Sequence, residues 1–321
     1  FHNTGSGFED RTAEAGLAGT EGWWNSLAAG DFDNDGDTDY VAGNLGLNTG
    51  FKATPEEPVR VHAADFDDNG SIDPILSRYI DGVRYPIASR DQLIDQMIGM
   101  KGRFPRHIDY AEATLEETLS EREREEALVL EAVRFESSHL ENLGDGTFAV
   151  RALPVEAQVA PLYGLLTGDF DGDGNVDVMG VGNTTAPDVQ TGQYVASFGT
   201  LLLGDGAGGF RPDPGFFTDG EGRGLARIAL GDGRFAIIVA RNSDRAQLFH
   251  ATGADLVPVQ VGPLETHAVI TLRDGRTRRV ELYHGSSYLS QSSRTLPVPA
   301  DAQRVVIHDA RGETRVVDPG R

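Results

Sequence analysis

The sequence contains no cysteine, so neither a disulfide nor a thiolate zinc site can hold the fold together. The redox compartment therefore cannot be inferred from cysteine usage. No apolar run reaches the roughly 20 residues that a membrane helix requires. Basic residues are also scarce, because 28 Lys and Arg face 50 Asp and Glu and give a formal net charge of -22. This charge disfavours nucleic-acid phosphates and anionic membrane surfaces, so we expect no nucleic-acid partner and no membrane insertion.

A signal peptide and an initiator Met are also missing, because the chain begins FHNTGSGFED. We interpret it as a mature or excised fragment rather than as a cytoplasmic protein. Its 321 residues are enough for two domains of about 100 to 200 residues each. The 40 glycines and the short apolar runs between turn residues predict an all-β architecture of many short strands.

An acidic nine-residue motif occurs three times in the sequence. DFDNDGDTD runs from Asp31 to Asp39, DFDDNGSID from Asp65 to Asp73, and DFDGDGNVD from Asp169 to Asp177. Asp, Asn and Gly favour turns, but a turn does not require an acid at the first, third and ninth positions. Carboxylates this close together repel one another unless a cation lies among them. Oxygen ligands on a short loop suit Ca²⁺, which takes six to eight of them.

The EF-hand is a competing interpretation, because its loop also opens D-x-D-x-D-G. An EF-hand needs a Glu at its twelfth position and helices on both sides. The twelfth positions here are Ala42, Leu76 and Gly180, and apolar β-forming residues flank each loop. We therefore predict a strand, a loop and a strand at each site, with the metal holding a β-hairpin connection.

The second acidic loop starts 34 residues after the first (65 minus 31), a period typical of propellers or repeat arrays. A helical insertion is predicted at about residues 88–133. It begins with a capping box at Ser89 and Gln92, continues with a helix over 109–119, and ends with a helix from Ser120 to about Val133. The insertion either carries specificity or covers a sheet edge.

Other segments also have β patterns. A strand is predicted over 133–136, and Gly-Asp-Gly turns follow at 144–146 and 204–206. A further unit over 226–240 lacks the acidic residues of the nine-residue motif, so we expect it to lack calcium. Trp23 and Trp24 are both predicted to lie in the core, although a strand would direct one of them outward for sugar stacking or a partner.

The three D-x-[DN]-x-[DN]-G-x-x-D loops and the recurring N-x-G-x-G-x-F closures resemble FG-GAP repeats of the VCBS type. These are calcium-bearing blades of β-propellers, also found in integrin α subunits. The resemblance implies a β-propeller, or part of one, over residues 1–262. It also implies three Ca²⁺ sites. Their ligands would be Asp31, Asp33, Asp35, Asp39 and the Asp37 carbonyl; Asp65, Asp67, Asn69, Asp73 and the Ser71 carbonyl; and Asp169, Asp171, Asp173, Asp177 and the Asn175 carbonyl.

About four repeat units are visible, fewer than the seven common in this family. The chain is therefore expected to be one part of a longer polypeptide or to need a partner chain to complete the ring. Residues 263–321 resemble the small β domain called ASPIC/UnbV, which follows VCBS repeats in secreted bacterial proteins and in a cartilage matrix protein. The resemblance rests mainly on GSSYLSQSS at 285–293. Residues 295–299 and 308–312 depart from the family pattern.

The serine-rich segment lies near His284, but no G-x-S-x-G elbow surrounds its serines. We expect these serines to hydrogen-bond their own backbone. The sequence thus favours a non-catalytic module that is secreted, periplasmic or on the cell surface, and that serves adhesion or recognition of a protein or glycan. The alternative, which comes from resemblance to certain propellers, is a calcium-dependent polysaccharide lyase. Its base would be Tyr79, Tyr85 or His62, with Arg78 or Arg84 holding the acid.

Overall fold

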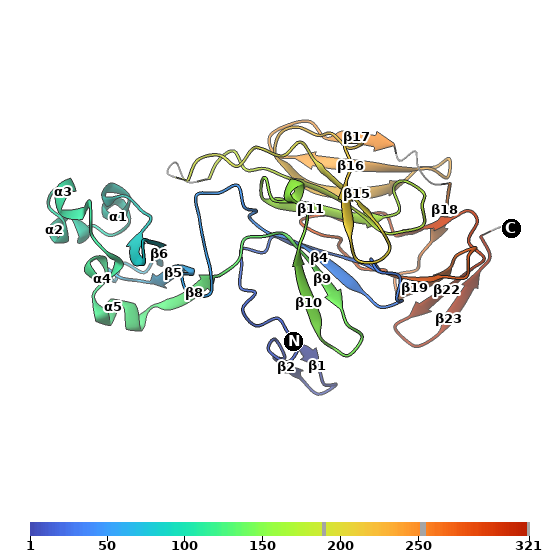
Figure 1. Ribbon diagram of the computed structural model, residues 1–321, viewed down its shortest axis with the longest axis horizontal. Helices are drawn as coiled ribbons and strands as arrows, with labels where there is room; N and C mark the ends of the chain where they lie inside the picture. The colour runs from blue at the N-terminus through green and yellow to red at the C-terminus, as the bar shows by residue number, and fades with distance from the viewer. Residues whose placement is uncertain (188–190, 251–254, 320–321) are drawn as a thin grey trace.

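The computed structural model describes residues 1–187, 191–250 and 255–319. These residues form mostly antiparallel β-sheets, with a few short helices (Figure 1). The all-β class predicted from the sequence is confirmed. Within these ranges the sheets do not close into a propeller ring or a barrel.

The first large sheet combines two segments that lie far apart in the sequence. Its strand order is β10-β9-β4-β3. The strands are β3 (Ser26–Gly30), β4 (Asp39–Gly43), β9 (Ser138–Asn142) and β10 (Phe148–Ala152). Tyr40 of β4 pairs directly with Leu140 of β9. Everything between β4 and β9 is therefore an insertion into this sheet.

The inserted unit has its own sheet, with the order β7-β6-β5-β8. Its strands are β5 (Val59–Ala64), β6 (Asp73–Ile80), β7 (Val83–Pro86) and β8 (Leu128–Ala132). The unit lies at one end of the molecule, on the left in Figure 1. The second acidic loop belongs to this nested sheet. The interpretation of the 34-residue spacing as the period of consecutive units is therefore wrong.

Short helices connect β7 to β8. They are α1 (Arg90–Gln96), α2 (Met100–Arg103), α3 (His107–Tyr110), α4 (Leu115–Thr118) and α5 (Glu121–Glu126). The capping box predicted at Ser89 is confirmed, and Ser120 caps α5 in a second box with Glu123. In the part of the chain that the structure describes, no helix is both long and apolar enough to cross a membrane.

Two helix predictions were wrong in their extent. The helix expected over 109–119 is divided into α3 and α4, because Thr114 adopts an extended conformation and caps α4 in a box with Glu117. The helix from Ser120 ends at Glu126 instead of Val133. The segment that follows becomes β8, whose residues pair with β5 and suit a strand. The strand predicted at 133–136 is reduced to a single bridge between Arg134 and Gly22.

The remaining sheets of the main body follow β10 and the short 3-10 helix Val155–Ala157. One has the order β11-β12-β13-β14, formed by Leu162–Gly168, Asp177–Gly182, Thr200–Gly204 and Phe210–Pro212. The next has the order β15-β16-β17, formed by Gly222–Ala229, Phe235–Arg241 and Gln247–His250. Strand β11 lies beside both β3 and β15.

The C-terminal segment forms two further sheets around a separate core. Strand β18 (Leu256–Gln260) pairs with β21 (Thr295–Pro299). The other sheet has the order β20-β19-β22-β23, formed by Thr277–Glu281, Glu265–Thr271, Arg304–Asp309 and Thr314–Val317. The Asp-Gly turn at 273–276 joins β19 to β20, and a second hairpin joins β22 to β23. At the other end of the chain, β1 (His2–Asn3) and β2 (Phe8–Glu9) form a small exposed hairpin.

The serine-rich segment 285–293 joins the C-terminal sheets to the main body. Its hydroxyl oxygens accept hydrogen bonds from backbone amides of distant strands. The pairs are Leu165 to Ser287 (2.8 Å), Leu225 to Ser290 (3.1 Å), Arg227 to Ser292 (3.0 Å) and Ala229 to Ser293 (3.2 Å). Alternate amides along one side of β15 are thereby satisfied. The expectation of bonds within the segment is met only in part, for example from the Ser290 hydroxyl to the Tyr288 carbonyl at 2.7 Å.

The two tryptophans have different environments. Trp23 packs edge-on against Phe51 and Phe135, with ring centroids 5.0 and 5.1 Å away. Trp24 is 37% exposed, and its indole donates a hydrogen bond to the Thr20 carbonyl. The prediction that both rings lie in the core is therefore wrong for Trp24.

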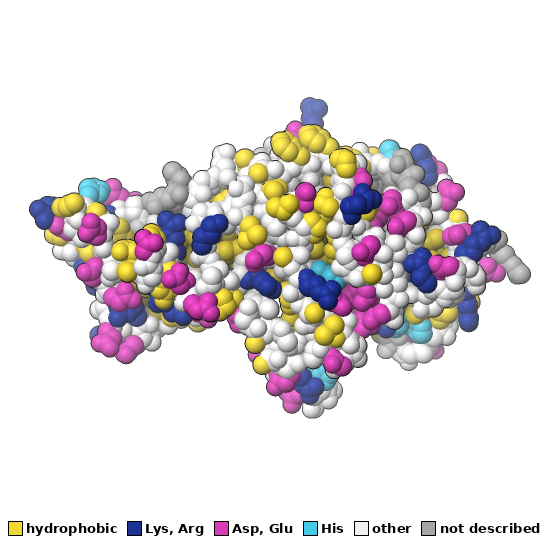
Figure 2. All heavy atoms as spheres, viewed as in Figure 1, with side chains coloured by type: hydrophobic (Ala, Val, Ile, Leu, Met, Phe, Trp, Pro, Cys, Tyr) yellow, Lys and Arg dark blue, Asp and Glu magenta, His cyan; other side chains and the backbone are white. Residues whose placement is uncertain are grey.

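Acidic side chains are spread over the whole face drawn in Figure 2, including the helical end, with Lys and Arg among them. The net charge of -22 is thus not gathered into one patch on this face. A distributed charge of this kind favours solubility more than it directs one partner to one site.

The nested unit and the main body have different hydrophobic cores, so they should unfold separately. Leu115 is fully buried among the helices and β6, whereas Leu202 is fully buried between the sheets of the main body. We predict that Leu115→Ala costs about 2–5 kcal/mol locally. In hydrogen exchange it should expose the amides of β5 to β8 and leave those of β11 to β14 protected. Leu202→Ala is the matched control with the reverse pattern, and uniform loss of protection in both variants would contradict the prediction.

Candidate metal centres

All three acidic motifs form the tight connection of a β-hairpin, as predicted. They join β3 to β4, β5 to β6, and β11 to β12. The sixth residue of each loop is a glycine in the left-handed region, with φ of 96° at Gly36, 87° at Gly70 and 89° at Gly174. A side chain would strain the backbone there, which explains why glycine occupies this position.

The ninth residue of each loop closes the hairpin. Its carboxylate accepts a hydrogen bond from the amide of the phenylalanine at the second position. The pairs are Phe32 to Asp39 (3.0 Å), Phe66 to Asp73 (3.1 Å) and Phe170 to Asp177 (2.6 Å). Sequence reasoning assigned these aspartates only to metal binding. The phenylalanine at the second position of every motif was the signal that could have indicated this second role.

Two of these closing carboxylates also hold the next strand of their sheet. Asp39 accepts the amide of Asn142 at 2.8 Å, and Asp177 accepts the amide of Gly204 at 2.9 Å. Both carboxylates are fully buried. Each of these two loops is therefore hydrogen-bonded to the neighbouring strand, β9 for the first loop and β13 for the third.

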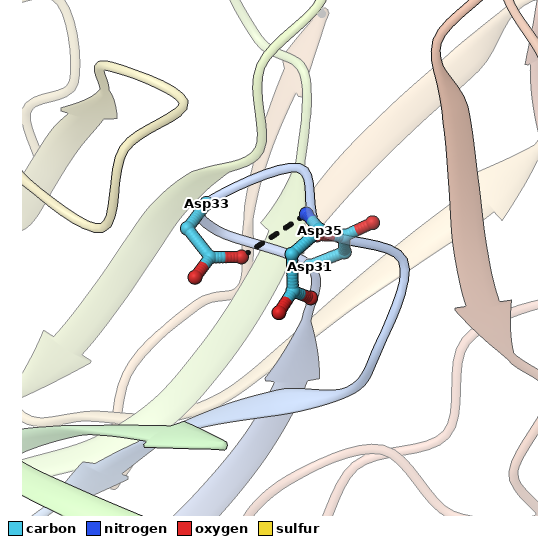
Figure 3. A group of neighbouring side chains, drawn as sticks. All are labelled: Asp31, Asp33 and Asp35. Carbon is cyan, nitrogen blue, oxygen red and sulfur yellow. Dashed lines mark hydrogen bonds between the residues drawn. The ribbon is translucent and has the colours of Figure 1, made fainter. Parts of the chain in front are cut away.

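Each loop gathers three carboxylates whose oxygens lie within 4.8 Å of one another. Figure 3 shows the first group on its loop, with the Asp35 amide donating to Asp33 at 3.2 Å. Such groups can hold a metal ion. The groups are Asp31, Asp33 and Asp35; Asp65, Asp67 and Asp73; and Asp169, Asp171 and Asp177.

The other predicted ligands lie outside these groups of three. Asn69 accepts the amide of Ser71 at 2.8 Å, and Asp173 accepts the amide of Asn175 at 2.7 Å. Asp37 has one buried carboxylate oxygen without a hydrogen-bond partner. Asn69 and Asp173 thus brace their loops. Burial raises the pKa of Asp37 to about 6, and the charges of Asp35 and Asp39 add to the shift.

The strongest indication of a missing positive charge is at Asp31. This residue is 1% exposed, and both of its carboxylate oxygens are buried without a hydrogen-bond partner. Burial raises its pKa to about 6, and the charges of Asp33 and Asp35 add to the shift. The Gly36 amide opposes the shift without reaching hydrogen-bonding geometry. A buried, unpaired carboxylate is costly, so these residues fit a bound cation.

The third loop has the same character. Burial raises the pKa of Asp177 to about 6 and also raises the pKa of Asp169. In the second loop, burial raises the pKa of Asp73, and one carboxylate oxygen of Asp67 is buried without a hydrogen-bond partner. All three donor sets consist of hard oxygen atoms, which suit a hard divalent cation.

The first and third loops contact each other. The Asn34 amide nitrogen donates to the Asn175 side-chain oxygen at 3.1 Å and to the Gly206 carbonyl at 3.2 Å. The Gly208 amide also donates to the Phe32 carbonyl at 3.1 Å. A change in one loop can therefore reach the other through direct contacts.

The C-terminal domain contacts the same two loops. Arg276 donates to the Asn175 side chain at 3.0 Å, and Arg278 donates to the Gly174 carbonyl. Thr38 of the first loop donates to Glu281 at 3.3 Å. Arg278 is 6% exposed; burial lowers its pKa, and the nearby carboxylate of Asp169 opposes this shift. The two candidate metal sites thus lie where the C-terminal sheets contact the main body.

The residues named for the lyase alternative lie on the nested sheet. Tyr79 and Arg84 pair across β6 and β7, and Arg84 donates a hydrogen bond to the Tyr79 hydroxyl. Tyr85 pairs with Arg78, which donates to the Gly50 carbonyl at 3.0 Å.

His62 is the third candidate base. It is 4% exposed, and burial together with the charge of Arg84 lowers its pKa. A neutral, buried imidazole is poorly placed to meet a polysaccharide. The structure therefore brings only Tyr79 and Arg84 into direct side-chain contact.

No protein-family model matches this chain, and no curated protein sequence does. The function is therefore argued from the chemistry of the loops and of the surfaces that they support.

Asp31 should make the metal-free protein sensitive to pH. Its folded-state pKa of about 6 lies above its ordinary value of 3.8, so the folded state binds more protons between these values. The unfolding free energy should therefore fall as the pH rises from about 4 to about 7, by up to about 3 kcal/mol from this group. Asp31→Asn removes the effect. In chelator, the melting temperature of Asp31→Asn minus that of the wild type should increase with pH; a constant difference would contradict the assignment.

Proposed function

We propose that this chain is a calcium-binding module of the FG-GAP/VCBS type that recognises a protein or glycan outside the cytoplasm. The observation that carries the proposal is the buried carboxylate of Asp31, which has no hydrogen-bond partner and belongs to one of three acidic groups. Calcium is proposed because it accepts many oxygen ligands in flexible geometry, whereas Mg²⁺ demands a near-ideal octahedron and keeps several waters. Calcium sites in extracellular modules are weak and fill where calcium is plentiful, which favours a secreted, periplasmic or cell-surface location.

The arrangement of the sheets supports a propeller-like assembly as part of this proposal. Strands β3, β11 and β15 lie side by side, and each is the first strand of its sheet. Two of these sheets continue through three further strands in the same sense, which is how propeller blades are built. We propose that a further part of a longer polypeptide, or a partner chain, completes the ring. The C-terminal sheets are proposed to be an ASPIC/UnbV-like domain.

A recognition role is supported by exposed aromatic side chains. Phe198 and Phe217 stack with centroids 5.5 Å apart and planes 9° apart, and they are 57% and 62% exposed. Trp24 adds a partly exposed indole elsewhere. Flat aromatic surfaces of this kind are suited to sugar rings and to protein partners. The loop carboxylates accept backbone amides and are the proposed metal ligands. We therefore propose that the module is not catalytic.

Calcium titration tests the metal part of the proposal. By isothermal titration calorimetry we expect three calcium ions per chain, and chelation should lower the melting temperature. Each site filled to a hundred times its Kd contributes about 2.7 kcal/mol. Asp31→Ala should remove one ion.

The matched control is Asp232→Ala, because Asp232 lies in the corresponding β15–β16 connection, which lacks an acidic group of three among the described residues. Three ions should remain in that variant. Unchanged melting curves in chelator, or equal stoichiometry in both variants, would overturn the calcium assignment.

The alternative is a calcium-dependent polysaccharide lyase using Tyr79 and Arg84. The contact between these side chains favours it. Their position does not, because Tyr79 lies six residues along β6 from Asp73, about 20 Å from the second loop. Incubation with acidic polysaccharides, followed by ultraviolet detection of unsaturated product, separates the two functions. Product that disappears in the double variant Tyr79→Phe, Arg84→Gln would establish the lyase and refute the non-catalytic proposal.

A further inference from the structure

A cavity of about 570 Å³ lies between the main body and the C-terminal domain. Its walls come from β3, β11, β20, β21 and the serine-rich segment, with Arg227 reaching it from β15. Small-molecule sites in proteins typically measure about 300–1,000 Å³. Of the residues that line this cavity, only Asp31 and Asp169 are proposed calcium ligands.

Most of the cavity lining is apolar. Aliphatic side chains from β11, β18 and β21, and from the residues that follow β18 and β20, face this space, namely Leu165, Leu256, Val261, Leu282, Leu296 and Pro297. Leu27 and Tyr283 also line it and are about half exposed, at 50% and 49%. The cavity therefore combines an apolar interior with residues that reach solvent. Such a lining favours a ligand with an apolar body over a sugar with many hydroxyl groups.

Arg227 is the unusual member of this lining. Its guanidinium donates one hydrogen bond, to the Thr167 carbonyl at 3.2 Å, and lies 5.6 Å from the ring centroid of Phe170. Among the described residues no carboxylate forms an ion pair with it. Burial lowers its pKa to about 10, so it remains cationic at neutral pH. By contrast, Arg223 on the same strand pairs with Glu221 at 3.2 Å.

The other arginines that line the cavity have partners of their own. Arg278 donates to the Gly174 carbonyl and lies near the Asp169 carboxylate. Arg279 pairs with Glu281 at 2.7 Å. Arg294 donates to several backbone carbonyls, including that of Gly262 at 2.7 Å. With cations bound in the first and third loops, Asp31 and Asp169 are neutralised. The guanidinium of Arg227 is then left as an unpaired positive charge beside an apolar space.

We propose that this cavity binds a small organic acid with one carboxylate and an apolar body. The planar guanidinium of Arg227 can hold a carboxylate through two parallel hydrogen bonds, and it has donors left for both. The apolar walls cover the rest of the ligand. This ligand adds to the recognition function and does not depend on the exposed aromatics.

Octanoate and octanol form a matched pair of probes, because they differ in the carboxylate and share the apolar chain. In calcium-containing buffer, calorimetry should give an affinity for octanoate at least about tenfold above that for octanol. Arg227→Met should abolish this difference and leave the octanol affinity unchanged. Arg223→Met is the control on the same strand and should bind both probes as the wild type does.

A second variant guards against misfolding of Arg227→Met. A Cβ at Gly168 would overlap the Arg227 guanidinium, so Gly168→Ala should displace the charge without removing it and weaken octanoate binding alone. Melting curves verify that each variant is folded. Failure of the wild type to bind octanoate, or equal octanoate binding by the wild type and Arg227→Met, would overturn the proposal. The proposal rests on the proposed calcium binding, which neutralises Asp31 and Asp169. Calcium stoichiometry is read separately, so a failure of the calcium sites can be told apart from a failure of acid binding at filled sites.

Discussion

Repulsion among carboxylates at three hairpin ends is the constraint on which the rest of this structure depends. Each loop places three carboxylates within 4.8 Å of one another, and Asp31 has no partner for either oxygen. The closing aspartates link each loop to the next strand of its sheet, because the Asp39 and Asp177 carboxylates also accept the amides of Asn142 and Gly204. Neutralising the loops therefore fixes the strands that follow them.

The same loops determine how the C-terminal domain sits. Arg276 and Arg278 of the β19–β20 hairpin donate to the third loop, while the serine hydroxyls satisfy alternate amides of β15. The cavity lies between these two sets of contacts, with Asp31 and Asp169 in its lining. The proposed metal binding in the first and third loops would support the walls of the cavity and remove the negative charges that would repel an acid from it.

Local features were predictable because local chemistry determines them. The hairpins, the left-handed glycines and the caps at Ser89 and Ser120 follow from nearby residues. Long-range choices were not predictable. Nothing near β4 indicates that its partner is β9, about a hundred residues later, rather than β5. The serines of 285–293 could satisfy any exposed amide, so their pairing with β15 depends on the assembled fold. Likewise, β8 became a strand because β5 offered it an edge.

The nested sheet explains why the second metal loop should be judged apart from the others. It has its own hydrophobic core, and its acidic group lies at the end of β6 remote from Tyr79 and Arg84. A lyase that used calcium to neutralise a uronate would need the ion and the base on the same sugar, within a few ångströms. A separation of about 20 Å along one strand prevents that arrangement. The second loop therefore holds β5 to β6, and we propose that recognition belongs to the surfaces that the loops keep in place.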